Sequence, residues 1–105
     1  MANWKSVAQL ADVPPGTALE VVIEDRILAL YNVEGEVYAL DGVCSHQGGP
    51  LGKGSLEGCV VTCPWHGWQF DVRSGVHQVT PTIVQPKIPL RIESDWIQVD
   101  LETSP

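Results

Sequence analysis

Positive charge is scarce in this chain of 105 residues. Six lysines and arginines stand against 13 aspartates and glutamates, which gives a formal charge of −7. Nucleic acids and anionic membranes would repel such a surface, because both are negatively charged themselves. The composition therefore argues against both as partners and favours a protein partner with a basic surface.

Long apolar runs and paired cysteines are also missing. No run approaches the roughly 20 apolar residues that a helix needs to span a bilayer. The first residues, MANWKSVAQLADVPPG, lack the charged and then apolar layout of a secretory signal. The cysteines number three, whereas small secreted domains stapled by disulfides usually have an even set. We therefore expect a cytoplasmic protein with no membrane segment.

What is present favours one all-β domain over residues 1–105. The chain is 44% hydrophobic, which suffices for one core, and it is too short for two. Short runs rich in Val, Ile, Leu and aromatic residues alternate with turn residues, as is typical of an antiparallel β-sandwich or barrel. The predicted strands are 18–24, 27–33, 36–40, 56–62, 68–72, 87–92 and 96–101. Turns are predicted at Glu34-Gly35, Glu57-Gly58, Ser74-Gly75 and Ser94-Asp95.

Glycine is concentrated in the middle of the chain. Eight of the ten glycines fall between Gly42 and Gly75, where a sandwich would otherwise place strands. Glycine permits unusual backbone conformations and a close approach to a ligand, so a glycine-rich loop in a small domain is more often functional than idle. We expect two functional loops there, at about 42–54 and 62–70.

Each of these loops contains one cysteine and one histidine. The first reads Cys44-Ser-His46 and the second Cys63-Pro-Trp-His66, with sixteen residues between the two motifs. Each motif follows a β-type run and leads into glycine, so two hairpin tips could bring the four side chains to one centre. The sequence therefore predicts a single metal site.

Zinc and a two-iron cluster both accept two thiolates and two imidazoles. Small zinc modules usually keep like ligands together, as C-x2–4-C and H-x3–5-H. Here cysteine and histidine alternate, which suits a cluster with two thiolates on one iron and two imidazoles on the other. The spacing favours the cluster. The alternatives are a zinc site, or two buried cysteines and two core histidines that bind no metal.

The paired motifs, Cys44-Ser-His46 and Cys63-Pro-Trp-His66-Gly-Trp, resemble those of Rieske [2Fe–2S] proteins. The resemblance covers nearly the whole chain, including 48–54 after the first motif, the FDVRSG turn after the second and the proline segment around Pro81. It implies a Rieske fold with a small cluster-binding subdomain of two loops, and one [2Fe–2S] cluster per chain. The segment near Pro81 would cover the cluster as a third loop.

The resemblance also implies a ligand set. Cys44 and Cys63 would hold one iron, and His46 and His66 would hold the other. Two ferric ions, two sulfides and two thiolates sum to about zero charge, whereas four thiolates would give about −2. An electron is easier to add to the neutral centre, so histidine ligation raises the reduction potential.

The chain departs from the membrane-anchored respiratory members of the family. Those proteins carry an extra cysteine in each loop, and the two form a disulfide, where this chain has Gly49 and Trp65. They also carry a serine and a tyrosine whose hydroxyls donate toward the cluster sulfurs, where this chain has Trp68 and Phe70. Fewer donors stabilise the reduced, more negative state less.

Rieske centres also occur in ring-hydroxylating oxygenases, whose catalytic domains add an iron held by two histidines and a carboxylate. This chain has three histidines, and two are assigned to the cluster. We therefore expect an electron carrier rather than an enzyme: a Rieske ferredoxin between an NAD(P)H-dependent flavoprotein reductase and a terminal oxygenase. It is expected to act as a monomer that forms transient complexes. The alternative is the small subunit of an assimilatory NADH nitrite reductase, bound to the large subunit.

Four further side chains are assigned from their positions. Cys59 is expected in a turn or strand, with no nearby cation to lower the pKa of its thiol. His77 is expected at the surface because it follows a turn. Trp68 alternates with Phe70 and is expected to pack, whereas Trp65 is open between packing and contact with a redox partner.

The missing hydroxyl donors lead to a testable prediction. We expect a reduction potential at the low end of the Rieske range, about −150 mV. A redox titration followed by visible absorption measures it. A clearly positive midpoint would contradict the prediction.

Overall fold

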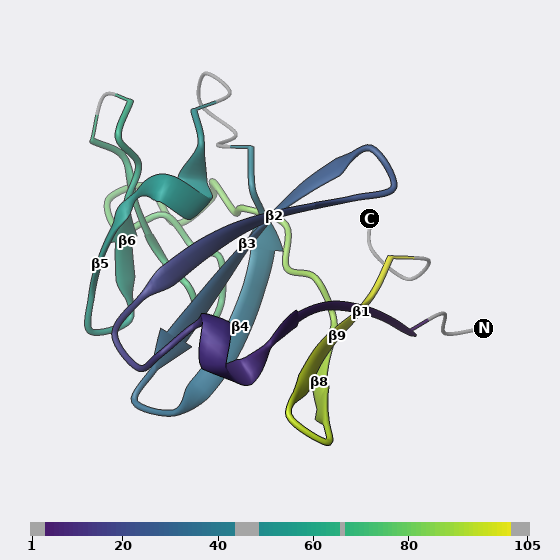
Figure 1. The fold of residues 1–105 in the computed structure, drawn as a ribbon. Helices are drawn as coiled ribbons and strands as arrows, with labels where there is room; N and C mark the ends of the chain where they lie inside the picture. Colours follow the sequence, from purple (N-terminus) through teal and green to yellow (C-terminus); the bar gives the residue numbers. More distant parts are fainter. Residues whose placement is uncertain (1–3, 44–48, 66, 102–105) are drawn as a thin grey trace.

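The computed structural model describes residues 4–43, 49–65 and 67–101, which are built from β-strands and two short 3-10 helices (Figure 1). In chain order the elements are β1 (Trp4–Gln9), η1 (Leu10–Asp12), β2 (Ala18–Ile23), β3 (Arg26–Val33), β4 (Glu36–Asp41), η2 (Leu51–Lys53), β5 (Ser55–Glu57), β6 (Val60–Thr62), β7 (Gln69–Asp71), β8 (Leu90–Glu93) and β9 (Trp96–Asp100). All strand pairs within the sheets are antiparallel, so the all-β prediction is confirmed. Across these ranges no helix has the length and apolar character needed to cross a membrane.

Three small sheets make up the described fold. The sheet β2-β3-β4 packs against the other two, because its residues belong to both buried clusters. Strand β3 is the reason for this arrangement, because its residues are buried on both faces. Leu28 and Leu30 belong to one buried cluster, while the alternating residues Ala29 and Tyr31 belong to the other. Since successive side chains of a strand point to opposite faces, β3 supplies both cores at once.

The two cores serve different sheets. Leu28 and Leu30 pack with Ile97 and Val99 of β9, on the side of the sheet β1-β9-β8. The other face of β3 contributes to the core under the sheet β5-β6-β7 and the two glycine-rich loops. That core comprises Ala29, Tyr31, Leu40, Leu51, Val61, Cys63, Phe70 and Val72. The candidate site therefore stands on its own buried base, opposite the sheet that contains the first and last strands.

The hydroxyl of Tyr31 ties this base to the first glycine-rich loop. It is fully buried and donates to the backbone carbonyl of Leu51 over 2.8 Å. Leu51 is itself fully buried and begins η2, which lies in the second half of the first loop. The bond fixes the point at which this loop enters the core.

Most predicted turns are present, and their backbone shows why the sequence marks them. Glu34 and Gly35 both have positive φ, as do Ser94 and Asp95, which is the conformation of a two-residue hairpin turn. Gly58 also has positive φ and divides the predicted strand 56–62 into β5 and β6.

Two further strands and one turn differ from the predictions. Strand β1 was missed because WKSVAQ has no alternating apolar pattern, and it forms through pairing with β9. The predicted strand 87–92 begins three residues late, at Leu90, after Pro89, which has no N–H to donate to a ladder. The turn at Glu24 and Asp25, with positive φ at both residues, was not predicted because neither residue is a glycine.

Replacing Tyr31 by phenylalanine tests the anchor on Leu51. We expect the free energy of unfolding to fall by about 0.5–1.5 kcal/mol, because a buried hydrogen bond is lost while the Leu51 carbonyl keeps its bond from the backbone N–H of Gly54. Denaturant unfolding at neutral pH measures the change. Tyr38→Phe is the matched control, since the Tyr38 hydroxyl makes an exposed bond to Glu36. Equal effects of the two substitutions would contradict the anchor role.

Candidate metal centre

Cys63 is the best-defined member of the predicted ligand set. It follows β6, is 1% exposed, and belongs to the core beneath the loops. Its backbone N–H donates to the carbonyl of Trp68 over 2.7 Å, which closes residues 63–68 into a tight loop. Gly67 lies in this loop with φ +74°, a conformation that side chains with a Cβ rarely adopt. The loop is therefore held at both ends, with the sulfur facing inward.

The first loop is closed at its base by backbone pairing. Val43 and Pro50 form an isolated antiparallel bridge, and the N–H of Leu51 donates to the carbonyl of Gly42 over 2.9 Å. The chain therefore leaves β4 and returns at nearly the same place. This pairing fixes the two ends of the segment 43–50, within the predicted loop 42–54.

The two loops meet at Gly49. A Cβ added to this glycine would lie 2.9 Å from the Sγ of Cys63 and 2.9 Å from the Cβ of Trp65. Real Cβ atoms do not approach other atoms so closely, so only glycine fits at position 49. The returning arm of the first loop thus packs directly on the sulfur and the side chain of the second. Positions 49 and 65 are adjacent, as the resemblance implied.

Cys44, His46 and His66 lie outside the described residues. In the ranges given above, no group of three or more His, Cys, Asp or Glu side chains is close enough to hold a metal. Cys63 forms no disulfide with Cys59, the other described cysteine. A buried thiol with another loop packed on its sulfur fits a soft metal centre, because thiolate is a soft ligand and burial keeps water from it.

The prediction that His77 lies at the surface was wrong. The side chain is 7% exposed, and its ring meets Trp68 and Phe70 nearly at right angles, with centroids 4.6 and 5.3 Å away. Its Nδ1 accepts the backbone N–H groups of Val79 and Thr80, so the hydrogen of the neutral ring is on Nε2. His77 thus joins the segment after β7 to the second loop. The predicted packing of Trp68 is confirmed, because it lies against the same core.

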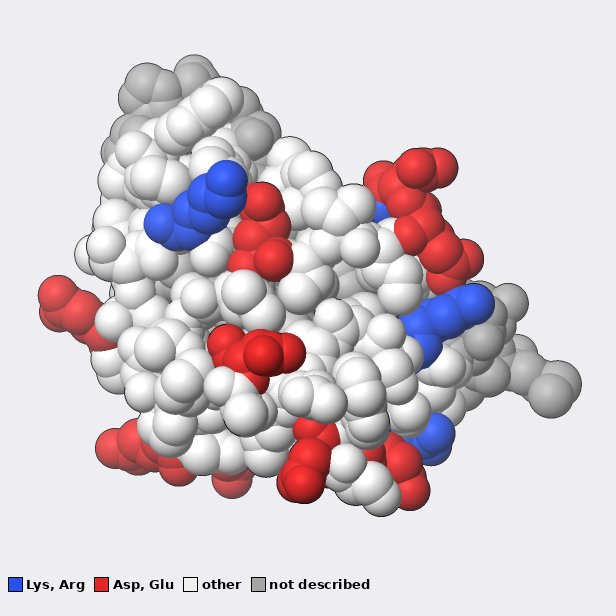
Figure 2. Space-filling model, in the orientation of Figure 1, with Lys and Arg blue, Asp and Glu red and all other residues white. Residues whose placement is uncertain are grey.

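Exposed apolar side chains occur on each segment around the site. Trp65 is 50% exposed and Val79 is 81% exposed, and Val43 and Val84 are also largely accessible. On the face drawn in Figure 2, acidic side chains are spread over the body, while the upper left end is largely uncharged. Lys53 forms an ion pair with Glu20, in which its Nζ lies 3.8 Å from a carboxylate oxygen. The surface near the loops is therefore suited to contact with another protein.

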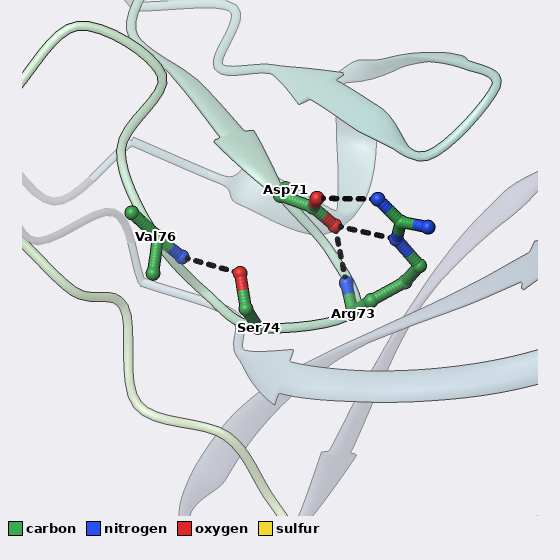
Figure 3. A network of polar contacts seen from close by, with 4 residues as sticks. All are labelled: Asp71, Arg73, Ser74 and Val76. Carbon is green, nitrogen blue, oxygen red and sulfur yellow. Dashed lines mark hydrogen bonds and ion pairs between the residues drawn. The ribbon is translucent and has the colours of Figure 1, made fainter. Parts of the chain in front are cut away.

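The turn after β7 is held by an ion pair (Figure 3). Asp71 accepts from the backbone N–H of Arg73 and, through both carboxylate oxygens, from its guanidinium. These bonds hold the pKa of Asp71 below its usual range, with the guanidinium as the main cause. Cys59 also contributes to lowering the pKa of Asp71, and Arg73 interacts electrostatically with Cys59. The expectation that no cation lies near Cys59 was therefore wrong, while its predicted place in a turn is confirmed.

Gly49→Ala tests the meeting of the two loops. The added methyl group has no space beside Cys63, so we expect the purified protein to hold at most half of the wild-type iron. Gly58→Ala is the control, because that position also favours glycine but has no atom within 4 Å of the added carbon. Iron analysis of both variants decides the matter, and full iron in Gly49→Ala would refute the tight contact.

Comparisons with known proteins agree with this arrangement. Residues 3–94 match the Rieske [2Fe–2S] domain, whose members carry a [2Fe–2S] cluster. The ferredoxin component of the naphthalene 1,2-dioxygenase system from Pseudomonas aeruginosa is 38% identical over 94% of this chain and 96% of its own. The Sphingomonas yanoikuyae B1 ferredoxin superposes with a TM-score of 0.85 at 35% identity, covering 93% of this chain and 98% of that one. A chain from a complex of reduced oxygenase and oxidized ferredoxin in carbazole 1,9a-dioxygenase gives 0.83 at 29% identity, with 92% of both chains covered. This chain belongs to the Rieske [2Fe–2S] family.

Proposed function

We propose that this protein is a Rieske ferredoxin that carries single electrons from an NAD(P)H-dependent flavoprotein reductase to the terminal oxygenase of a ring-hydroxylating system. The observation that carries the proposal is the packing of Gly49 on the buried Cys63 sulfur, which brings the two motif loops together. Relatives that match nearly the whole chain are named as ferredoxin components of dioxygenase systems. They support this function over the small subunit of a nitrite reductase.

The proposed ligands are Cys44 and Cys63 for one iron and His46 and His66 for the other. The described residues support this set through Cys63, whose sulfur faces the base of the first loop. When bound, the cluster accepts and releases one electron. We further propose that residues 1–105 form a single domain, with the cluster-binding loops at about 42–54 and 62–70.

The chain's own residues would serve the transfer in two ways. The core beneath the loops, including Phe70 and Leu51, keeps water from the inner side of the centre. On the outer side, Trp65 and the exposed valines near it can contact a partner protein. Because these side chains are uncharged, the contact buries no unpaired charge. The acidic body can steer the protein toward a basic surface. Such an interface is small and short-lived, as a carrier that alternates between two partners requires.

No substrate is transformed by this chain in our proposal, which makes it a carrier and not an enzyme. One of the solved complexes contains an oxygenase together with a ferredoxin, which supports a terminal oxygenase as one partner. The reductase, the monomeric state and a cytoplasmic location are proposed from the sequence alone.

Ligand substitutions test the function and the site together. We expect wild-type protein to contain two irons and two sulfides per chain, with a reduced-state electron paramagnetic resonance (EPR) spectrum whose average g lies below the free-electron value. Cys44→Ser and His66→Gln should abolish or change that spectrum, because each removes a ligand.

The chain offers matched controls for both substitutions. Cys59→Ser removes the remaining cysteine and should keep the wild-type spectrum. His77→Gln removes the remaining histidine and should keep two irons and a two-iron spectrum, with a small shift of the g values because His77 packs against the second loop. The proposal fails if His66→Gln leaves the visible and EPR spectra unchanged. Zinc without sulfide in the wild-type protein would also overturn it.

A further inference from the structure

A fully buried glutamine joins the segment after β7 to the start of the first loop. Gln85 is 0% exposed, and its side-chain nitrogen donates to the carbonyls of Asp41 and Val43 over 2.7 and 2.6 Å. The orientation of the amide follows from the chemistry, because only its nitrogen can donate to a carbonyl. The amide group thus donates one hydrogen bond to the last residue of β4, Asp41, and one to Val43, two residues further on.

The backbone that presents Gln85 is fixed on both sides. Its N–H donates to the carbonyl of Gly75 over 2.7 Å, and the N–H of Asp41 donates to the carbonyl of Pro86 over 2.9 Å. Val76 and Val84 form a bridge just beside it. A Cβ on Gly75 would collide with the carbonyl oxygen of Gln85, so the backbone at Gly75 and the backbone at Gln85 lie in very close contact. The amide is thus held on a rigid frame.

The two carbonyls lie where the chain leaves the sheet for the first loop. Gly42 still pairs with β3, through a 2.8 Å bond from its N–H to the carbonyl of Ile27. Beyond it, the carbonyl of Val43 belongs to the planar peptide that links Val43 to Cys44. The hydrogen bond from Gln85 therefore fixes the orientation of the peptide plane between Val43 and Cys44, the first proposed ligand.

The same segment also holds the second loop. His77, eight residues before Gln85, contacts Trp68 with its ring and binds the backbone of Val79 and Thr80 with Nδ1. Residues 75–86 thus contact the first loop through one polar side chain and the second through another. In this chain, which has Gly49 and Trp65 where the respiratory members of the family have a disulfide, such contacts can take over the task of fixing the loops relative to each other.

We propose that Gln85 is a positioning residue for the metal centre: its amide holds the arm that leads to Cys44 and so sets the geometry of the bound cluster. The inference rests on the proposed function, because it requires the cluster between the two loops. A buried amide costs desolvation that an apolar side chain would not, and its two short bonds are made to the last residue of β4 and to the start of the loop that follows it. The position is therefore used for geometry as well as for packing.

The test compares Gln85→Glu with Gln78→Glu in purified holoprotein. Glutamate has the shape of glutamine, but an ionised carboxylate cannot donate and would face two carbonyl oxygens. Gln78 is exposed in the same segment, so its substitution matches the change of charge. We expect Gln85→Glu to lose its visible cluster absorption about tenfold faster than wild type and to shift the reduced-state g values. Gln78→Glu should match wild type in both.

Two further variants keep the outcome decisive. Val99→Ala lowers stability in the other core and should leave the g values unchanged, which separates positioning from a general loss of stability. Gln85→Met, uncharged and of similar length, replaces Gln85→Glu if the latter does not fold, and the same shift is expected. Wild-type g values and cluster lifetime in the Gln85 variants would overturn this inference alone. A wild-type protein without a two-iron spectrum would instead overturn the proposed function.

Discussion

The approach of Gly49 to the sulfur of Cys63 is the contact on which the site depends. Two segments separated by more than a dozen residues can share one metal centre only if their backbones come this close, and a side chain at position 49 would push them apart. The contact is supported from below, since Cys63 belongs to the buried core and Tyr31 fixes Leu51 two residues beyond Gly49. The core beneath the loops therefore fixes their position, and β3 contributes Ala29 and Tyr31 to that core.

Strand β3 also explains how a domain of this size carries such a site without strain on the rest of the fold. Its alternating side chains fill two separate cores, one beneath the loops and one against β9. The sheet β1-β9-β8 contributes no residue to the core beneath the loops. One face of the sheet β2-β3-β4 therefore supports the loops, and the other packs against β9. Both cores depend on β3.

Sequence reasoning reached the family from local pattern. The spacing of Cys44, His46, Cys63 and His66 indicated it, and glycine and turn residues predicted loops at about 42–54 and 62–70. Residues whose role depends on distant contacts were missed. His77 gave no sign of burial, because its neighbours Trp68 and Phe70 reach it only after β7 has paired. Gln85, a polar residue beside Pro86, gave no sign that its amide would meet backbone more than 40 residues away. Strand β1 likewise depends on β9, at the other end of the chain.

The space around Gly49 also limits how this branch of the family can change. A cysteine introduced there alone would find no room, since Trp65 and Cys63 already occupy the volume that its Cβ needs. Replacement of Trp65 alone would leave a gap beside Gly49 and would form no disulfide between the loops. A disulfide between positions 49 and 65 therefore requires both residues to change together, because the cysteine at 49 needs the volume that Trp65 now fills.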